Sequence, residues 1–233
     1  MSLKYNIVYN KCNQSAISIL DINKVNWKEL QEEKYLNFNI DLMDMNKKNL
    51  RKVIKAIEKI LKKYTSKYEY NFYISNFNEN NQNHKDFIKI IETLFLKDIR
   101  DRYNFIYDEV CKFLDNEFIS KDLCQFRNNK CGEKENLSSE VGCCRHYKNK
   151  LIGPIGLKNP LIVCEYLKNK RCSAKCISCK LYTCDYLRRK GIQFKIKNIV
   201  LLDIFFNPIQ KFIIKYSVFT PKEEIIRKLL LFK

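Results

Sequence analysis

The sequence predicts an α+β protein, and three observations support this class. Apolar and polar residues alternate in the first part of the chain, which is typical of strands with one buried face. Farther along, apolar residues recur at three- and four-residue steps, which is typical of amphipathic helices. Nine of the 11 cysteines lie between Cys124 and Cys184, which indicates a separate cysteine-rich segment. We therefore expect an N-terminal β-α segment, a helical middle, a Cys-rich metal-bound segment and C-terminal helices.

Residues 1–83 are expected to form a β-α scaffold domain. Alternation of apolar and polar residues marks its strands. The four strands are expected at residues 5–9, 17–19, 36–42 and 68–74. A helix precedes the last strand, because the apolar residues from Leu50 to Leu61 follow a three- and four-residue spacing. The element order is thus β-β-β-α-β, and an asparagine-rich loop over 76–83 ends the domain.

Residues 84–233 are expected to form a helical domain that contains the cysteine-rich segment 121–191. An apolar stripe over 85–118 predicts two helices before that segment. Two further helices are expected after it. In the last one Thr220 is expected to cap the helix, with Pro221 at its first position and a glutamate shortly after.

The stretch 199–219 is the most apolar part of the chain. Charged and polar residues interrupt it, among them Asp203, Lys211 and Lys215. A membrane-spanning helix needs about 20 consecutive apolar residues. The pattern therefore favours a buried or interfacial helix, and no membrane span is expected.

Glycine and proline usage excludes several function classes. All five glycines and all four prolines lie after residue 131, so the first part of the chain has no glycine-rich loop for a nucleotide phosphate. The late pair Gly153 and Gly156 lacks a third glycine and a following Lys-Ser/Thr. A G-x-S-x-G motif is absent as well. With only His84 and His146 as imidazoles, histidine-driven catalysis is disfavoured, and any reaction is left unassigned.

The chain is strongly basic, with a formal net charge of +18. Part of this charge reflects a compositional bias, because Lys, Asn and Ile occupy 88 of the 233 positions (35, 25 and 28). The rest is local. Residues 121–190 contain 16 Lys and Arg against 6 Asp and Glu, a net charge of +10. Such a segment suits an anionic partner or an anionic thiolate centre.

The same segment carries the candidate metal ligands. The N-terminus has no charged-then-apolar leader pattern, so we expect a cytoplasmic protein in a reducing environment, where clustered thiols indicate metal ligands rather than disulfides. Cys12 and Cys111 lie outside the cluster and are expected to be small buried residues. The candidate ligands are Cys124, Cys131, Cys143, Cys144, Cys164, Cys172, Cys176, Cys179, Cys184 and His146.

The spacing divides these ligands into two halves. The first runs from Cys124 to His146 and the second from Cys164 to Cys184. Thiolates two to four residues apart can close on one ion, and four of them form a tetrahedral zinc site or hold an iron–sulfur cluster. We therefore expect zinc or an iron–sulfur cluster at one or two sites.

Part of the segment resembles a known family. Cys143-Cys144, then Cys164-Glu-Tyr-Leu-Lys-Asn-Lys-Arg-Cys172, then Cys179-Lys-Leu-Tyr-Thr-Cys184 is similar to the YkgJ-type cysteine-cluster family, a zinc- or iron-chelating domain. The resemblance implies that these six cysteines form the chelating set. It covers residues 143–184, with Cys176 as an additional cysteine and a wider spacing upstream.

Two functions follow, and the sequence leaves both open. In the first, the metal is central to the function of the protein. In the alternative, zinc is structural in a nucleic-acid-binding module. An acidic protein partner would satisfy the same charge. The basic residues around the second half are Lys168, Lys170, Arg171, Lys175, Lys180, Arg188, Arg189 and Lys190.

Overall fold

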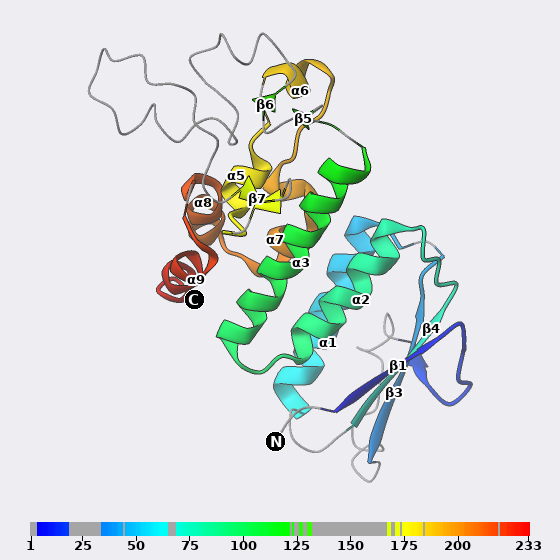
Figure 1. Cartoon of the computed structure of the whole chain (residues 1–233). Coiled ribbons are helices and arrows are strands. Elements are labelled where there is room, and N and C mark those ends of the chain that lie inside the picture. The colour runs from blue at the N-terminus through cyan, green and yellow to red at the C-terminus, as the bar shows by residue number, and fades with distance from the viewer. Residues whose placement is uncertain are drawn as a thin grey trace, which may run out of the picture. The chain divides into compact units, whose positions relative to one another are not determined.

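The structure is a computed structural model of the chain, and it contains both helices and strands, as the α+β class requires (Figure 1). Two compact units are present, Met1–Arg102 and Tyr103–Lys233. The domain boundary expected from the sequence, after residue 83, falls within the first unit. The structure describes residues 4–18, 34–43, 45–64, 69–121, 123, 126–127, 130–131, 167–168, 171–172, 174–183, 185–218 and 220–233.

The first unit contains a four-stranded sheet whose paired strands all run parallel, in the order β1-β4-β3-β2. The four expected strands are all confirmed. Helix α1 (Lys47–Tyr64) connects β3 to β4, as a parallel crossover requires. The strands are β1 (Tyr5–Tyr9), β2 (Ile17–Ser18), β3 (Tyr35–Asp41) and β4 (Glu69–Ser75).

The parallel pairing differs from what alternation alone suggests, since parallel strands are usually apolar on both faces. The second face of this sheet carries asparagines instead. Asn6, Asn71 and Asn37 lie side by side in the strand register. The Asn6 amide donates to the Asn71 oxygen at 2.9 Å, and the Asn71 amide donates to Asn37 at 2.8 Å. These amides hydrogen-bond to one another across the strands, so a polar face is compatible with parallel strands.

Helices α1 and α2 (Gln82–Phe95) contribute the apolar core on the other face of the sheet. Phe95 lies at the centre of an aromatic cluster, with its ring centroid 4.5 Å from that of Tyr5, 5.3 Å from Tyr70 and 5.7 Å from Phe72. Helix α1 and strands β3 and β4 thus bury the apolar residues that the periodicity assigned to their inner faces, whereas Tyr9 of β1 is 44% exposed.

His84 in the first turn of α2 has a structural role. Its side chain is buried, and its Nδ1 accepts a hydrogen bond from the backbone N–H of Asn78 at 3.0 Å. This contact holds the loop between β4 and α2 against the helix. One of the two imidazoles of the chain is therefore engaged in local structure.

The second unit is built around α3 (Ile99–Ser120), whose first turn belongs to the first unit. Asp98 starts this helix by accepting from the backbone N–H groups of Arg100 and Asp101. The expected division of 85–118 into two helices is therefore confirmed. The remaining helices of the unit are α5 (Ile177–Leu181), α6 (Asp185–Arg189), η3 (Ile196–Asn198), α7 (Val200–Phe205), α8 (Pro208–Tyr216) and α9 (Lys222–Leu230).

The C-terminal part corrects two expectations. Three α-helices, α7 to α9, follow residue 191, where two were expected. The additional break lies at Asn207, whose side chain forms a capping box with Gln210 at the start of α8. Thr220 does not cap α9. Pro221 precedes that helix, and the Thr220 hydroxyl instead donates to the carbonyl of Val218.

The apolar stretch 199–219 is not one continuous helix, because α7 and α8 divide it. Within the part of the chain that the structure describes, no helix is both long and apolar enough to cross a membrane.

Candidate metal centre

Four of the ten candidate ligands lie within the described residues. Cys131 ends strand β6 (Lys130–Cys131), Cys172 ends strand β8 (Arg171–Cys172), and Cys176 and Cys179 lie at α5. The other six lie outside the described residues: Cys124, Cys143, Cys144, Cys164, Cys184 and His146.

Cys131 and Cys172 occupy equivalent positions in two short antiparallel hairpins. In the first, β5 (Phe126–Arg127) pairs with β6 (Lys130–Cys131), so that Phe126 lies opposite Cys131. In the second, β7 (Leu167–Lys168) pairs with β8 (Arg171–Cys172), so that Leu167 lies opposite Cys172. Each hairpin therefore has two-residue strands, a two-residue connection and a cysteine paired with an apolar residue.

The residues around each hairpin cysteine also match in the sequence, although the spacing between the cysteines does not show it. Phe126-Arg-Asn-Asn-Lys-Cys131 and Leu167-Lys-Asn-Lys-Arg-Cys172 share the order apolar, basic, Asn, polar, basic, Cys, and each follows another cysteine. The two copies have different spacings from that upstream cysteine, so a search for a fixed period does not find them. The two hairpins therefore share a six-residue pattern and the register position of their cysteine.

Residues 174–180, here called the cysteine loop, contain the other two described candidates. Cys176 is the residue before α5, and Cys179 lies within the helix, so the three-residue step brings them onto neighbouring positions. Both side chains are buried, at 1% and 7% exposure. The Cys176 Sγ lies 3.3 Å from the Ser217 carbonyl, a contact that a protonated thiol makes as a donor.

Cys111 on α3 lies beside the same loop. Its side chain is buried, as expected, and its Sγ lies 3.2 Å from the carbonyl of Lys175. The structure therefore adds a third thiol to the surroundings of the loop, from a residue that lies outside the cysteine cluster of the sequence. The expectation for Cys12 is wrong, because this cysteine is exposed.

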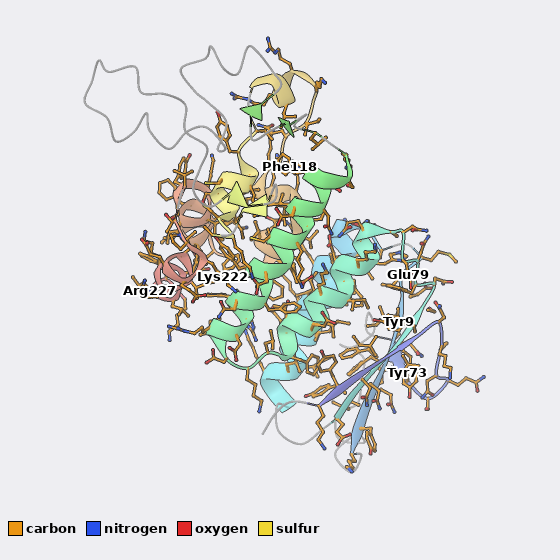
Figure 2. The ribbon with its side chains drawn as sticks, in the orientation of Figure 1. Tyr9, Tyr73, Glu79, Phe118, Lys222 and Arg227 are labelled. Atoms are coloured by element: carbon orange, nitrogen blue, oxygen red, sulfur yellow. The ribbon has the colours of Figure 1, made fainter. Side chains whose placement is uncertain are left out.

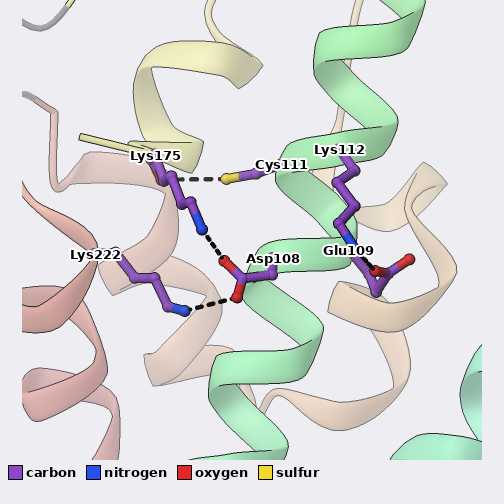
Figure 3. A network of polar contacts seen from close by, with 6 residues as sticks. All are labelled: Asp108, Glu109, Cys111, Lys112, Lys175 and Lys222. Atoms are coloured by element: carbon purple, nitrogen blue, oxygen red, sulfur yellow. Dashed lines mark hydrogen bonds and ion pairs between the residues drawn. The ribbon is translucent and has the colours of Figure 1, made fainter. Parts of the chain in front are cut away.

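Asp108 on α3 holds the cysteine loop and α9 at once (Figure 3). Its Oδ1 lies 2.8 Å from the Lys175 Nζ and its Oδ2 lies 2.9 Å from the Lys222 Nζ. Burial works against the charged carboxylate, but the hydrogen bonds and charges of the two lysines outweigh it and hold the pKa of Asp108 below its ordinary value. The hydrogen bond to Asp108 correspondingly raises the pKa of Lys175.

The backbone at Lys175 forms a turn that contacts on both sides hold in place. Its φ of 51° lies in the left-handed region, which a lysine adopts at a cost. The loop is held on both sides of this turn, because the backbone N–H of Lys222 donates to the carbonyl of Ala174 at 3.2 Å and the N–H of Ile177 donates to the hydroxyl of Tyr107 at 3.1 Å. Figure 2 shows Lys222 on the side of α9 that faces α3 and Arg227 on the other side.

Two further side chains attach α5 to its neighbours. The Ser178 hydroxyl donates to the carbonyl of Ile214 on α8. Lys180 is buried, with 6% of its side chain exposed, and forms an ion pair with Asp115 on α3. An ammonium group at this depth needs such a partner, since burying an unpaired charge is costly. The cysteine loop is therefore attached to α3, α8 and α9.

These contacts change the distribution of charge that the sequence suggests. Lys175 and Lys180 belong to the predicted basic set, but both are paired with carboxylates of α3. Arg188, Arg189 and Lys190 are exposed at the end of α6. Exposed basic side chains near the described cysteines therefore lie both at Lys175 and after α5.

Among the described residues, no group of three or more His, Cys, Asp or Glu side chains is arranged to hold a metal ion. The described thiols supply parts of a site: two hairpin cysteines in equivalent positions and a buried, well-held pair at α5. Comparison with protein-family models, with curated proteins and with solved structures finds no match to the chain. The similarity to the YkgJ-type family stays a prediction.

Proposed function

We propose that this protein binds zinc or iron–sulfur through its cysteine-rich segment, at two centres that each use one of the two hairpins. The observation that carries the proposal is the pair of similar hairpins, with Cys131 and Cys172 at the same register position. The first centre would draw on the ligands from Cys124 to His146, and the second on those from Cys164 to Cys184.

The composition of the hairpins supports a bound metal. Two-stranded hairpins of this length are marginal in water without further support. In addition, each places two basic residues opposite each other, Arg127 with Lys130 and Lys168 with Arg171, and like charges at such positions are destabilising. An anionic thiolate–metal centre would supply both a crosslink and the opposite charge.

The attachment of the cysteine loop to its neighbours supports the second centre. Structural metal sites bind tightly when their ligands are already held in position. Cys179 lies in α5, which Lys180 and Ser178 attach to α3 and α8. Metal binding at this end of the loop would therefore need little rearrangement of the backbone. Cys176, whose thiol donates to Ser217, would have to give up that hydrogen bond to become a ligand.

Metal analysis of the protein purified without oxygen tests the proposal. We expect each of the two centres to hold one zinc ion or one iron–sulfur cluster. If both hold zinc, the chain should contain about two zinc ions. A brown protein with visible absorbance would identify iron–sulfur. C131S and C172S should each lose the metal of one centre and retain the other, whereas C12S, at an exposed cysteine of the first unit, should retain both.

Two results would contradict the proposal. One is a native protein that contains no metal in stoichiometric amount and is as stable with a chelator as without it. The other is an unchanged metal content in both C131S and C172S, with C12S as the reference.

A second candidate function is nucleic-acid binding with structural zinc, and one observation favours it. Residues 188–197 contain Arg188, Arg189, Lys190, Lys195 and Lys197 without any acidic residue, and all five are exposed. Phosphate contacts by such residues make binding fall steeply with salt.

Fluorescence anisotropy with single-stranded and duplex oligonucleotides between roughly 50 and 200 mM salt tests this candidate. Replacing Arg188, Arg189 and Lys190 by Gln should lower the slope of log K against log salt by roughly two to three. The matched control replaces three exposed lysines of α1, Lys48, Lys52 and Lys55, and should leave the slope unchanged. Equal effects of the two triple variants, or no binding at low salt, would exclude a specific basic site here.

A further inference from the structure

Helix α8 has an exposed apolar face. Ile209, Phe212 and Tyr216 are 53%, 63% and 56% exposed. Steps of three and four residues place them on one side of the helix. The Phe212 and Tyr216 rings lie 4.6 Å apart and form a continuous aromatic surface. A surface helix normally turns its large apolar residues toward the core, so this arrangement needs an explanation.

The orientation of α8 is determined by its other face. Gln210 and Ile214 are buried there. The Gln210 amide donates to the Tyr103 hydroxyl at 2.7 Å and to the Leu229 carbonyl at 3.0 Å. Rotating the helix to bury Phe212 would break both hydrogen bonds and bring a polar side chain to the surface. The apolar face therefore points outward as part of the native packing.

The end of α9 extends this surface. Helices α8 and α9 lie side by side (Figure 1), and the Asn207 amide at the start of α8 donates to the Phe232 carbonyl at 2.8 Å. Leu231 and Phe232 are 78% and 43% exposed. We call Ile209, Phe212, Tyr216, Leu231 and Phe232 the α8–α9 patch.

Basic residues accompany the patch. From Pro208 to Lys233 the chain has six Lys and Arg (Lys211, Lys215, Lys222, Arg227, Lys228 and Lys233) against Glu223 and Glu224, and the paired carboxylates of Asp203 and Asp108 bring the net charge of the region to +2. Lys211 and Lys222 are partly buried in ion pairs with Asp203 and Asp108. Lys215 is exposed, and its Nζ lies 4.9 Å from the centre of the Tyr216 ring. An aromatic ring with a lysine beside it suits the boundary between an apolar phase and water.

We propose that the α8–α9 patch binds the surface of an anionic lipid bilayer. The aromatic and aliphatic side chains would enter the boundary between headgroups and acyl chains, and Lys215 beside Tyr216 would contact the anionic headgroups. A second copy of the chain fits less well, since it would bring two surfaces of the same positive charge together. Nucleic acid offers the charge but no apolar phase for five large apolar side chains.

Cosedimentation of the full chain with lipid vesicles tests the proposal. Vesicles of phosphatidylcholine with roughly 30 mol% phosphatidylserine should bind the protein, and pure phosphatidylcholine should bind it much more weakly. F212S and L231S should each weaken binding about tenfold, because each removes apolar area that the bilayer would bury. K215Q should weaken it about fivefold. M43S, at an apolar residue of the first unit that is 69% exposed, should bind as the unaltered protein does.

Thermal unfolding and light scattering complete the test. F212S and L231S should melt within a few degrees of the unaltered protein, as expected for exposed side chains. A loss of stability as large as that of a core truncation would show that the chain itself covers the patch and would overturn the proposal. A dimer that dissociates in F212S would overturn the proposal in favour of self-association. Vesicle binding that F212S, L231S and M43S weaken equally would overturn it as well, because the patch would then have no specific role.

Discussion

Asp108 connects three elements of the second unit through its two ion pairs. It lies 67 residues from Lys175 and 114 residues from Lys222 in the sequence, yet its two oxygens bind both ammonium groups. One carboxylate thereby holds α3, the cysteine loop and α9 together. Nothing in the local sequence around Asp108 indicates this role, because helix periodicity describes only which side of α3 the residue occupies.

We predict that D108N makes the free energy of unfolding less dependent on pH in the acidic range. The pKa of Asp108 is lowered in the folded state, so its contribution is complete above its ordinary pKa and is lost as the pH falls through the lowered value. Its side chain is one-third exposed, so after solvent screening we expect D108N to cost about 1 kcal/mol at neutral pH. Urea unfolding should show that difference at pH 7 and a much smaller one near pH 2.

E224Q is the control for this prediction. Glu224 pairs with Lys228 at 2.7 Å on the surface of α9, and this lysine lowers the pKa of Glu224 as well. Because the pair is exposed, its removal should leave the urea midpoint nearly unchanged. A D108N midpoint equal to that of E224Q at pH 7 would show that the Asp108 contacts do not stabilise the unit.

At the scale of the element, the strands and long helices could be predicted because their signals are local. The alternation in β3 and β4 and the stripes of α1 and α2 belong to single segments, and each predicts the element that the structure contains. Parallel pairing could not be predicted, since it depends on which strands meet. Helix ends also differ from the prediction. Thr220 and Asn207 both fit a capping pattern in the sequence. In the structure Asn207 forms the capping box, with Gln210 as its partner.

We predict that N207A destabilises the second unit by about 1 to 2 kcal/mol. The substitution removes the cap of α8, where the Asn207 oxygen accepts from the Gln210 N–H at 2.9 Å, and also the amide donor to Phe232. N207D retains the accepting oxygen and loses only the donor, so it should cost less. T220A should cost little, because Thr220 does not cap α9. Urea unfolding of the three variants measures this order, and equal losses for N207A and T220A would contradict it.

At the scale of the whole molecule, the two units differ in their content of glycine, proline and cysteine. The first unit contains no glycine or proline and only Cys12 of the cysteines. All other cysteines belong to the second unit. The sequence could therefore locate the candidate site, because cysteine clustering is visible in one dimension. The surroundings of the site could not be predicted. Cys111, Asp108 and Asp115 reach the cysteine loop from α3, which is separated from it by more than 50 residues.

This division leads to a prediction about metal removal. If the metal crosslinks only the second unit, its loss should destabilise that unit and leave the parallel sheet intact, because the core around Phe38, Phe72 and Phe95 contains no candidate ligand. Native-state hydrogen exchange before and after treatment with a chelator measures this. Amides of β3 and β4 should keep their protection, while those of β8 and α5 should exchange at least about tenfold faster. Equal acceleration in β4 and α5 would show that the metal supports the whole chain, and no acceleration in α5 would show that the cysteine loop holds its structure without metal.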